Sequence, residues 1–515
     1  MNYKVLIASA GIGNRLEGMT KNINKALVSV AHKPVISYII DKIPIEIEIV
    51  IAIGYKGDIL KNFINMNYPE RKVTFVEVDN YLGKGSGLGY SILKCKDELQ
   101  CPFIFTSNDT IVLEDLPVPD HNWLGQTKSD KSDQYRTISS KDGIVKKINS
   151  KGECTNCNTY IGLAGIFDYE IFWESMIFGM NQGAVEIGES YALRDLIDKD
   201  LKTKDFTWFD TGNITKLNQT RRFFNNNSYN ILEKEEEAIW FSQDKVIKFS
   251  VDEDFIKNRV IRSTLLDGFV PQVISYSKNM YAYKKIDGEI FSKNPDLEKF
   301  QSFLNWMNSF WIKPKISNTQ KIEELCHEFY YQKTYKRIKE YFIKTESKDE
   351  NDIINGIESK EIYELLKLVN WNEICKGISV RFHGDLHFEN ILVNNSKFIL
   401  LDWRQDFGGE LFYGDIYYDF AKLNHGLIVS HEMVDKNNFN INIKGKLINF
   451  SFERDERLID CEAYFYSWLQ ANGYNVQKVK ILTALVFLNI ATLHHKPYDK
   501  FLFYLGKSML NKTLN

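Results

Sequence analysis

The sequence predicts an α/β first part, built on a sheet with parallel strands, followed by an α+β second part. Three observations lead to this prediction. Short apolar segments alternate with helical patterns over roughly the first 225 residues, and such alternation is typical of an α/β sheet. Near residue 225 the chain becomes rich in strand patterns. From about residue 295 it is mainly helical, apart from a strand-like island around 379–403.

Four apolar runs in the first part have the length and composition of buried strands, and helical patterns separate them. Ligands of open α/β sheets gather at the carboxyl ends of the strands, so the residues that follow these runs are the first candidates for a site. The predicted strands are Val5–Ala8, Ile49–Ile53, Val73–Val76 and Phe103–Phe105, and the clearest predicted helices are Val35–Lys42 and Lys56–Asn65.

The second part begins after Asn225–Ser228, a polar run of the kind that joins domains. Two antiparallel strands are predicted over Glu237–Phe241 and Lys245–Phe249. A helix over Phe255–Leu266 and a strand over Tyr281–Lys285 follow. This order predicts a small sheet lobe ahead of a helical lobe.

At 515 residues the chain is too long for one hydrophobic core. No internal repeat is visible, so two unlike domains fit better than a duplication. We predict domains 1–225 and 226–515, the second with a sheet lobe of about 228–290 and a helical lobe of about 291–515.

Composition excludes several classes of function. A net charge of -3 gives no reason to expect a nucleic-acid or membrane-surface binder. No apolar run approaches the ~20 residues of a membrane span, and the N-terminus has the pattern of a buried strand rather than a signal peptide. We therefore expect a cytoplasmic protein. Cys154 and Cys157 form a lone C-x-x-C, for which we expect two reduced thiols in a loop, with a metal or redox role as the alternative.

A first phosphate-binding pattern directly follows the first predicted strand. Ala10, Gly11 and Gly13 form a loop whose backbone N–H groups can approach a triphosphate. Arg15 can neutralise phosphate charge, and Lys25 lies ten residues further on. A G-x-G loop alone is weak evidence for a phosphate site, because glycine also occurs in ordinary tight turns.

The register of the following residues makes the pattern specific. It resembles the opening of the sugar-phosphate nucleotidyltransferase family, which includes glucose-1-phosphate thymidylyltransferase and its uridylyl and cytidylyl relatives. Gly18 and Asn24 stand where the family often has proline, and we expect them to loosen the loop. The matching positions are Gly11, Gly13, Arg15, Leu16, Thr20, Lys25, Lys33 and Pro34.

Later landmarks follow in the order of the same family, and the resemblance implies their roles. Gly85 and Ser86, within Gly83–Gly89, would contact the nucleotide. Lys151 and Glu186 would bind the sugar phosphate. Asp109, which ends a strand, and Asp210, within Trp208–Gly212, would bind the metal.

The resemblance implies a Rossmann-like (GT-A-like) mixed sheet sandwiched by helices, and a defined reaction. A phosphate oxygen attacks the α-phosphorus of an NTP, and pyrophosphate leaves. Asp109 and Asp210 would hold Mg²⁺ while Arg15 and Lys25, as catalytic residues, offset phosphate charge. A general base is unnecessary because the attacking phosphate is already ionised.

A second phosphate-transfer motif lies at His383–Asn390. Asp385 and Asn390 have the spacing of a kinase catalytic loop, and Asp402 ends a strand twelve residues later. The segment resembles the aminoglycoside phosphotransferase and choline kinase family, which implies a bilobal kinase-like domain. In such kinases the first aspartate orients and deprotonates the acceptor hydroxyl, while the asparagine and the later aspartate bind Mg²⁺. These roles fall on Asp385, Asn390 and Asp402.

Lys248 is the candidate for the lysine that binds the nucleotide phosphates of ATP, because it lies in a predicted strand upstream of the loop. Two features depart from the kinase pattern. No glycine precedes it over Glu233–Phe241, and Asn258 and Arg259 stand where a partner glutamate is usual.

Together the motifs predict a bifunctional enzyme. The kinase would phosphorylate a small hydroxyl acceptor, and the transferase would couple that phosphate to an NMP, giving an NDP-activated precursor for surface polysaccharide. A sugar is favoured by Glu186 and Trp208–Gly212; a choline or amino-alcohol kinase paired with a cytidylyltransferase is the alternative. A degenerate kinase-like binding or regulatory domain is the alternative of another class. The expected partners are small molecules, with no nucleic acid and no membrane insertion, and the oligomeric state stays open.

Overall fold

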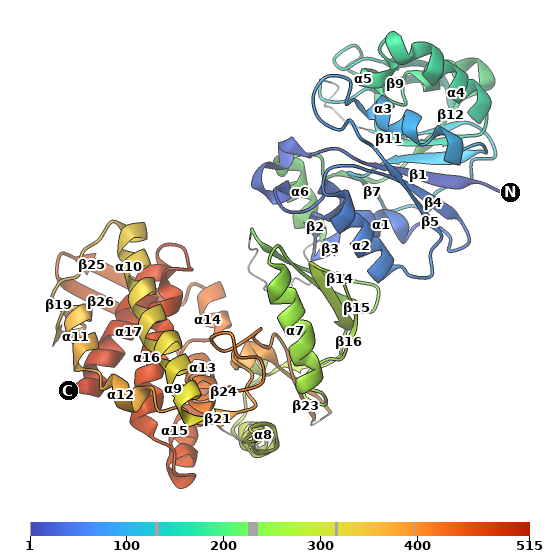
Figure 1. Cartoon of the computed structure of the whole chain (residues 1–515). Helices are drawn as coiled ribbons and strands as arrows, with labels where there is room; N and C mark the ends of the chain where they lie inside the picture. The colour runs from blue at the N-terminus through green and yellow to red at the C-terminus, as the bar shows by residue number, and fades with distance from the viewer. Residues whose placement is uncertain (1, 129–132, 225–234, 315–317, 396) are drawn as a thin grey trace. The chain divides into compact units, whose positions relative to one another are not determined.

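The computed structural model describes residues 2–128, 133–224, 235–314, 318–395 and 397–515, and within them the chain forms two compact units (Figure 1). The first unit comprises Met1–Glu253 and Ile274–Lys285, and the second comprises Asp254–Val273 and Ile286–Asn515. The predicted domain boundary at residue 225, with the polar run Asn225–Ser228, falls outside the described residues. In the described part of the chain, no helix combines the length and apolarity needed to cross a bilayer.

The first unit is built on a mixed sheet of nine described strands. Its β1 strand pairs in parallel with both β4 and β6, and β4 pairs in parallel with β5. The sheet becomes mixed at β11, which is antiparallel to β6 and β8. The expectation of a mixed α/β fold at the N-terminus is therefore confirmed. In sheet order the strands are β5 (Val73–Glu77), β4 (Glu48–Ile53), β1 (Lys4–Ser9), β6 (Phe103–Ser107), β11 (Asn158–Ile166), β8 (Trp123–Thr127), β12 (Lys202–Asp205), β10 (Ile144–Asn149) and β9 (Thr137–Lys141).

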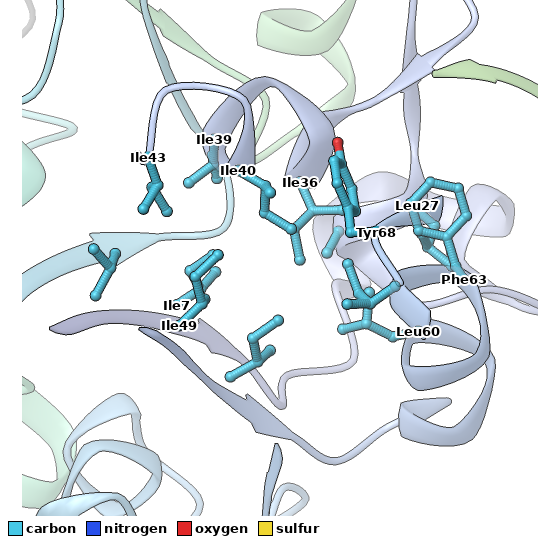
Figure 2. Packing of buried hydrophobic residues seen from close by; sticks show 14 of the residues in the cluster. Ile7, Leu27, Ile36, Ile39, Ile40, Ile43, Ile49, Leu60, Phe63 and Tyr68 are labelled. Atoms are coloured by element: carbon cyan, nitrogen blue, oxygen red, sulfur yellow. The ribbon is translucent and has the colours of Figure 1, made fainter. Parts of the chain in front are cut away.

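Side chains alternate between the two faces of this sheet, as the pleat of a strand requires. Ile7 and Ile49 pack with residues of α1 and α2 such as Ile36 and Leu60 (Figure 2). The intervening residues of β1 and β4 pack with α3, α4 and α5. Helices thus cover both faces. Their bounds are α1 (Val35–Ile40), α2 (Gly57–Asn67), α3 (Leu88–Lys94), α4 (Tyr169–Phe178), α5 (Ala184–Ile187) and α6 (Ile214–Phe224).

A second, four-stranded sheet belongs largely to the same compact unit. Trp240 on β14 is fully buried, stacks edge-on with Phe63 of α2 at a ring distance of 5.3 Å, and donates Nε1–H to the carbonyl of Leu27 at 3.0 Å. The strands that the sequence places in a small lobe of the second domain therefore share a hydrophobic core with the first sheet. In order they are β14 (Glu237–Ser242), β15 (Lys245–Ser250), β17 (Met280–Lys284) and β16 (Val273–Tyr276).

Two short pairs complete the first unit. The β7–β13 ladder matters most, because Asp109 directly precedes it and Asp210 ends it. The pairs are β7 (Thr110–Val112) with β13 (Trp208–Asp210), and β2 (Ser29–Val30) with β3 (Lys33–Pro34).

The second unit is mainly helical, as expected. The long helices α16 and α17 are each largely buried, as is α13 beside the predicted catalytic loop. The helices are α7 (Glu253–Leu265), α8 (Leu297–Phe310), α9 (Thr319–Cys326), α10 (Lys333–Thr345), α11 (Ile362–Leu368), α12 (Trp371–Ile374), α13 (Ile416–Ile428), α14 (His431–Asp435), α15 (Glu456–Ala471), α16 (Val476–Ala491) and α17 (Tyr498–Leu514).

The strand-like island at 379–403 is present, but it is not the only strand region after residue 295. A four-stranded sheet joins segments near 355 and 445, so the expectation of an otherwise helical chain is wrong there. The β25–β26 hairpin turns at Gly445, whose φ of 58° suits glycine. The strands are β18 (Glu289–Ile290), β21 (Ser379–Val380), β22 (Ile391–Asn394), β23 (Lys397–Leu400) and β24 (Gly414–Asp415), and the added sheet has β20 (Ile357–Ser359), β19 (Asp352–Ile354), β26 (Leu447–Phe452) and β25 (Phe439–Lys444).

Candidate active site

The glycine loop of the first unit leaves β1 at Ala10, which is buried, and Gly11, which is exposed. Gly13 has a φ of 77°, a left-handed conformation that favours glycine. A Cβ on Gly13 would also lie 3.1 Å from side-chain atoms of both Thr20 and Lys25. The turn at Gly13 therefore requires glycine for backbone and packing reasons together, and it brings Lys25 against the loop.

Asn24 anchors this loop instead of loosening it, so the expectation from the missing proline is wrong. Its side chain is fully buried and Nδ2 donates to the carbonyls of Ser9 at 2.9 Å and Tyr55 at 2.7 Å. Oδ1 accepts from the amide of Ala26 at 2.9 Å. An amide side chain supplies three hydrogen bonds where proline would supply only a fixed φ.

The two predicted metal-binding aspartates lie together. Asp210 is paired across the β7–β13 ladder with Thr110, the neighbour of Asp109. A Cβ built on Gly212 would lie 2.9 Å from Oδ2 of Asp109 and 3.0 Å from Oδ1 of Asp210. The same point is 3.6 Å from a guanidinium nitrogen of Arg15. Two carboxylates and one exposed arginine, from segments about a hundred residues apart, therefore converge at the end of the glycine loop.

Lys25 and Ser107 hold Asp109 in place. Lys25 Nζ forms an ion pair with Oδ2 of Asp109, and Ser107 Oγ donates to Oδ1. Burial alone would raise the pKa of Asp109, but Lys25, Ser107 and Arg15 outweigh it and hold that pKa below its ordinary value. Asp109 is thus ionised at neutral pH while its side chain is only 17% exposed.

Tyr135 is a site residue that the sequence did not indicate. Its hydroxyl donates to Oδ2 of Asp210 at 2.5 Å, and Gly212 N–H donates to Oδ1 at 2.7 Å. Burial and the carboxylate of Asp210 raise the pKa of the tyrosine hydroxyl. Tyr135 lies just before β9, far from any recognised motif, so only the fold brings it to Asp210.

The predicted nucleotide segment and the predicted sugar-phosphate segment pack directly on each other. A Cβ on Gly87 would lie 2.1 Å from the carbonyl oxygen of Val185 and 3.0 Å from Cα of Glu186. A Cβ on Gly89 would likewise lie 2.0 Å from the carbonyl oxygen of Ala184. The two glycines let the start of α3 approach the backbone of α5. The loop with Gly85 and Ser86 is thereby placed beside Glu186, whose side chain is exposed.

Glu189, three residues after Glu186, is a further residue that the sequence analysis missed. It is 5% exposed, and Oε2 has no hydrogen-bond partner among the described residues. Burial raises the pKa of Glu189 to about 7, against the opposing effect of Arg136 and of Tyr160. The raised pKa makes this carboxyl protonatable near neutral pH.

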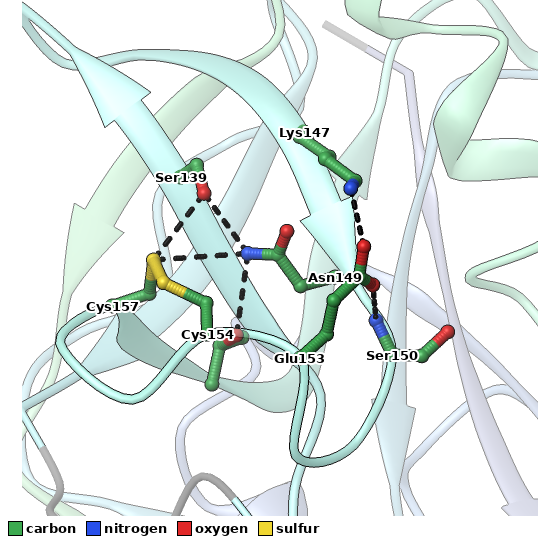
Figure 3. Close-up of a disulfide and its surroundings, with 8 residues drawn as sticks. Ser139, Lys147, Asn149, Ser150, Glu153, Cys154 and Cys157 are labelled. Carbon is green, nitrogen blue, oxygen red and sulfur yellow. Dashed lines mark hydrogen bonds and ion pairs between the residues drawn. A yellow bond between two sulfur atoms is a disulfide. The ribbon is translucent and has the colours of Figure 1, made fainter.

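Lys151 is exposed, in the turn between β10 and β11, and no described contact ties it to Asp109 or Asp210. The same turn holds a disulfide between Cys154 and Cys157 (Figure 3). The expectation of two reduced thiols is therefore wrong. Sγ of Cys157 lies 3.3 Å from Oγ of Ser139, and Asn149 Nδ2 approaches the same sulfur at 3.7 Å. The disulfide closes the segment Cys154–Cys157, which follows Lys151 in the same connection between β10 and β11.

The predicted catalytic loop of the second unit presents Asp385 to solvent. Its side chain is 36% exposed, and Lys422 Nζ lies 2.7 Å from Oδ1. Oδ2 lies 3.7 Å from Nε2 of His387. Burial in the loop would raise the pKa of Asp385, but Lys422 and His387 hold it well below its ordinary value. Lys422, from α13, is a charged neighbour that the sequence motif did not reveal.

His383 and Asp419 fix the backbone of this loop. His383 is fully buried; its Nε2 donates to the carbonyl of Leu401 at 2.9 Å, and Nδ1 accepts from Asp385 N–H at 3.2 Å. Burial lowers the pKa of His383 to about 3, so it is a neutral brace. The carboxylate of Asp419 accepts from the amides of His383 and Gly384 at 2.8 and 2.7 Å. Asp419 therefore holds the backbone of the catalytic loop from the first turn of α13, through two hydrogen bonds to loop amides.

Asn390 and Asp402 adjoin the same loop. Asn390 is 7% exposed, and its Nδ2 donates to the carbonyl of Asp385 at 2.9 Å. Backbone bonds on either side of Asp402 tie it to the loop, since Leu401 N–H donates to Asn390 and Arg404 N–H donates to His383. Asp402 has a φ of 57°, an uncommon backbone state for aspartate.

Arg259 on α7 lies against Asp402, with Nη1 3.1 Å from Oδ1. On this helix a kinase usually has a glutamate that pairs with the ATP-binding lysine, and here Asn258 and Arg259 stand at that place. Lys248 lies on β15 of the first unit, where it is 6% exposed and opposite Ile239 and Tyr281. Its role in binding ATP stays a prediction.

Comparison with known proteins bears on the first unit. No protein-family model matches the chain. "Bifunctional protein GlmU" of Methanococcus vannielii is 24% identical over 204 residues, 38% of this chain and 47% of that protein. The protein of the same name from Methanocaldococcus jannaschii is 30% identical over 112 residues, 22% of this chain and 26% of that protein. The N-terminal region resembles sugar nucleotidyltransferases. The chain spans less than half the length of these curated relatives.

Solved structures show similarity at low identity. The CTP:phosphocholine cytidylyltransferase LicC of Streptococcus pneumoniae is 18% identical with a TM-score of 0.37, covering 43% of this chain and 99% of that one. A UTP-bound UGPase from Acinetobacter baumannii is 16% identical with a TM-score of 0.36, covering 44% of this chain and 93% of that one.

Proposed function

We propose that the first unit is a magnesium-dependent nucleotidyltransferase that joins an NMP from an NTP to the phosphate of a small molecule. The observation that carries the proposal is the convergence of Asp109, Asp210 and Arg15 on one point beside the glycine loop. The similarity of the N-terminal region to GlmU proteins supports the same class of reaction.

The donor set at this point fits Mg²⁺. Both candidate ligands are carboxylate oxygens, which are hard ligands of the kind that Mg²⁺ prefers. Neighbouring cations hold the pKa of Asp109 low, so its carboxylate is charged at neutral pH. When bound by Asp109 and Asp210, the ion would offset negative charge on the phosphates.

The side chains around the metal ligands divide the remaining work. A phosphate oxygen of the acceptor forms a bond to the α-phosphorus, the bond from that phosphorus to the bridging oxygen breaks, and pyrophosphate leaves. The positive charges of Arg15 and Lys25 would offset the negative charge of the phosphates. The backbone N–H groups of the glycine loop would donate hydrogen bonds to phosphate oxygens. Gly85 and Ser86 would contact the nucleotide, and the other predicted contacts, to the sugar phosphate, fall on Lys151 and Glu186.

The proposal extends to the second unit as a small-molecule kinase. Asp385 is ionised, partly exposed and held by Lys422, as a residue must be that orients a hydroxyl and takes its proton. The hydroxyl oxygen forms a bond to the γ-phosphorus of ATP, the bond to the bridging oxygen breaks, and ADP leaves. Asn390 and Asp402 offer an amide oxygen and a carboxylate for Mg²⁺.

The acceptor has two candidate classes. A sugar is favoured because Glu186 and Trp208–Gly212 resemble the corresponding segments of sugar-phosphate enzymes, and the product would be an NDP-sugar for surface polysaccharide. The second class is choline or a related amino alcohol with a CTP-dependent transferase. The solved LicC structure, described as a CTP:phosphocholine cytidylyltransferase, motivates its inclusion in the test.

One observation favours a different role for the second unit. Arg259 neutralises Asp402 at 3.1 Å, where a kinase needs a free carboxylate for Mg²⁺. A degenerate kinase-like domain that binds a nucleotide or regulates the transferase would tolerate this ion pair.

The test is incubation of the purified chain with ATP, CTP, UTP, GTP and dTTP and a panel of sugars, amino alcohols and their phosphates, with product identification by mass spectrometry. The proposal predicts one NDP-linked product from a phosphorylated acceptor. Formation of an NDP-amino alcohol without any NDP-sugar selects the second acceptor class. Equal, near-zero ATP consumption by the parent and Asp385→Ala selects the degenerate-domain role.

A further inference from the structure

Three side chains beside the catalytic loop bring metal-ligating atoms together. A ring nitrogen of His387, a carboxylate oxygen of Glu389 and a ring nitrogen of His431 all lie within 4.8 Å of one another. The side chains of His387 and Glu389 are only 12% and 13% exposed, whereas His431 is exposed at the start of α14. The group is therefore anchored on one side and open to an entering ion on the other.

The outer contacts of these residues fix them in a ligating geometry. Oε1 of Glu389 accepts from the backbone N–H of His431 at 3.0 Å, which leaves Oε2 toward the Nδ1 atom of His387 at 2.8 Å. Nε2 of His387 lies 3.7 Å from the carboxylate of Asp385 and 3.1 Å from Nδ2 of Asn390. A histidine with a metal on one ring nitrogen and a carboxylate near the other is the usual arrangement in protein metal sites.

One further histidine, His425, lies beside the group. The ring centre of His425 lies 6.4 Å from that of His387, and that of His431 lies 5.6 Å away. His425 is 9% exposed, and neither of its ring nitrogens has a hydrogen-bond partner among the described residues. A buried imidazole without a hydrogen-bond partner is uncommon, and here it lies beside the group of ligating atoms.

The donor set selects the class of ion. Two imidazole nitrogens with one carboxylate suit Zn²⁺ and similar first-row divalent ions, and three protein ligands leave one tetrahedral position for water. Mg²⁺ prefers oxygen ligands alone. We propose that His387, Glu389 and His431 form a binding site for Zn²⁺ or a similar transition-metal ion, separate from the oxygen ligands Asn390 and Asp402.

The experiment uses the full chain with the Cys154–Cys157 disulfide kept oxidised. A chelator first removes bound metal from the protein, and the chelator is then removed. Zn²⁺ is titrated in competition with a chromophoric chelator, and Co²⁺ is titrated while visible absorption is recorded. The variants are His431→Ala and Glu389→Gln. His327→Ala, which removes an exposed histidine of the same unit outside the group, is the matched control.

The parent and His327→Ala are expected to bind one more equivalent of Zn²⁺ than His431→Ala, and to give the intense Co²⁺ absorption of a tetrahedral site. Glu389→Gln should lower the affinity for this additional Zn²⁺ ion by about tenfold or more. Equal stoichiometry and affinity in the parent, His431→Ala and Glu389→Gln would overturn the proposal. Because no turnover is measured, the result does not depend on phosphotransfer by this unit.

Discussion

Replacing Gly212 by alanine tests the geometry of the proposed nucleotidyl-transfer site directly. The new methyl would lie 2.9 Å from Oδ2 of Asp109 and 3.0 Å from Oδ1 of Asp210. Because the φ of Gly212 is outside the left-handed region, alanine adds no backbone strain. The substitution therefore presses an apolar group against both carboxylates and keeps every charged residue in the sequence.

The expected magnitudes follow from these contacts. Both carboxylates must move by a few tenths of an ångström, and overpacking of this kind costs about 1–3 kcal/mol of stability. Activity is expected to fall far more, by about a hundredfold or more, because small displacements of catalytic groups have effects of that size. A higher Mg²⁺ requirement should accompany the loss, since the methyl displaces both proposed ligands.

The assay is pyrophosphate release as a function of Mg²⁺ concentration, with a thermal melt to confirm folding. Gly18→Ala is the matched control, because a Cβ at Gly18 meets nothing within 4 Å, and it should change neither activity nor stability. If Gly212→Ala keeps the activity and the Mg²⁺ dependence of the parent, the two carboxylates do not act together on the ion.

Three further substitutions probe the supports of the two sites. Asn24→Ala leaves two buried carbonyls without their donor, so the unfolding free energy should fall by about 2–4 kcal/mol, measured by urea denaturation. Asp419→Ala leaves two amides and an indole N–H unpaired, and amide hydrogen exchange across residues 380–390 should accelerate by about a hundredfold or more. Glu189 has a folded pKa of about 7 against an unfolded value of ~4.3. Below ~4 the carboxyl is protonated in both states and has no effect on stability; as pH rises from ~4 to 7 the unfolded chain ionises first, so the fold loses stability, and above 7 the loss is complete at about 3–4 kcal/mol. Glu189→Gln should therefore raise the melting temperature at pH 8 and leave it nearly unchanged at pH 4.

Clear results would contradict each of these. An Asn24→Ala unfolding midpoint equal to that of the parent would mean that the glycine loop is held by other contacts. Parent-like exchange in Asp419→Ala would mean that the catalytic loop does not depend on the buried carboxylate. A stabilisation by Glu189→Gln that is the same at pH 4 and pH 8 would exclude a titrating group as its cause.

Residues that follow a strand in a short motif could be placed from the sequence. Asp109 lies two residues after the end of β6, and Asp385 and Asn390 share one loop, so local spacing predicts their neighbourhood. The family resemblance predicted that Asp210 lies near Asp109. The pairing of β7 with β13 is the physical reason for this proximity. The alternation of apolar segments likewise predicted β1, β4, β5 and β6.

Contacts between distant segments could not be predicted in this way. Tyr135 and Lys422 reach Asp210 and Asp385 through tertiary packing, and neither belongs to a local pattern. The compact first unit includes Trp240 because that side chain packs against Phe63 of α2 in one buried cluster. No boundary signal near residue 225 reveals this contact.

The β19 and β20 strands have only three residues each, too few to show a period. The β25 and β26 strands do carry apolar residues at alternate positions, Phe439, Ile441 and Ile443 facing Ile448, Phe450 and Phe452. This strand pattern was readable in the sequence and was overlooked among the surrounding helices.

Nucleotidyl transfer by Asp210→Asn is the most direct measurement of the central claim. With the accepted nucleotide and acceptor phosphate, pyrophosphate release should fall by about a hundredfold or more, because one of two converging carboxylates loses its charge. Phosphorylation of the acceptor from ATP should stay at the parent rate, and Asp402→Asn should show the reverse pattern. Parent-level pyrophosphate release by Asp210→Asn would contradict the account of the first unit.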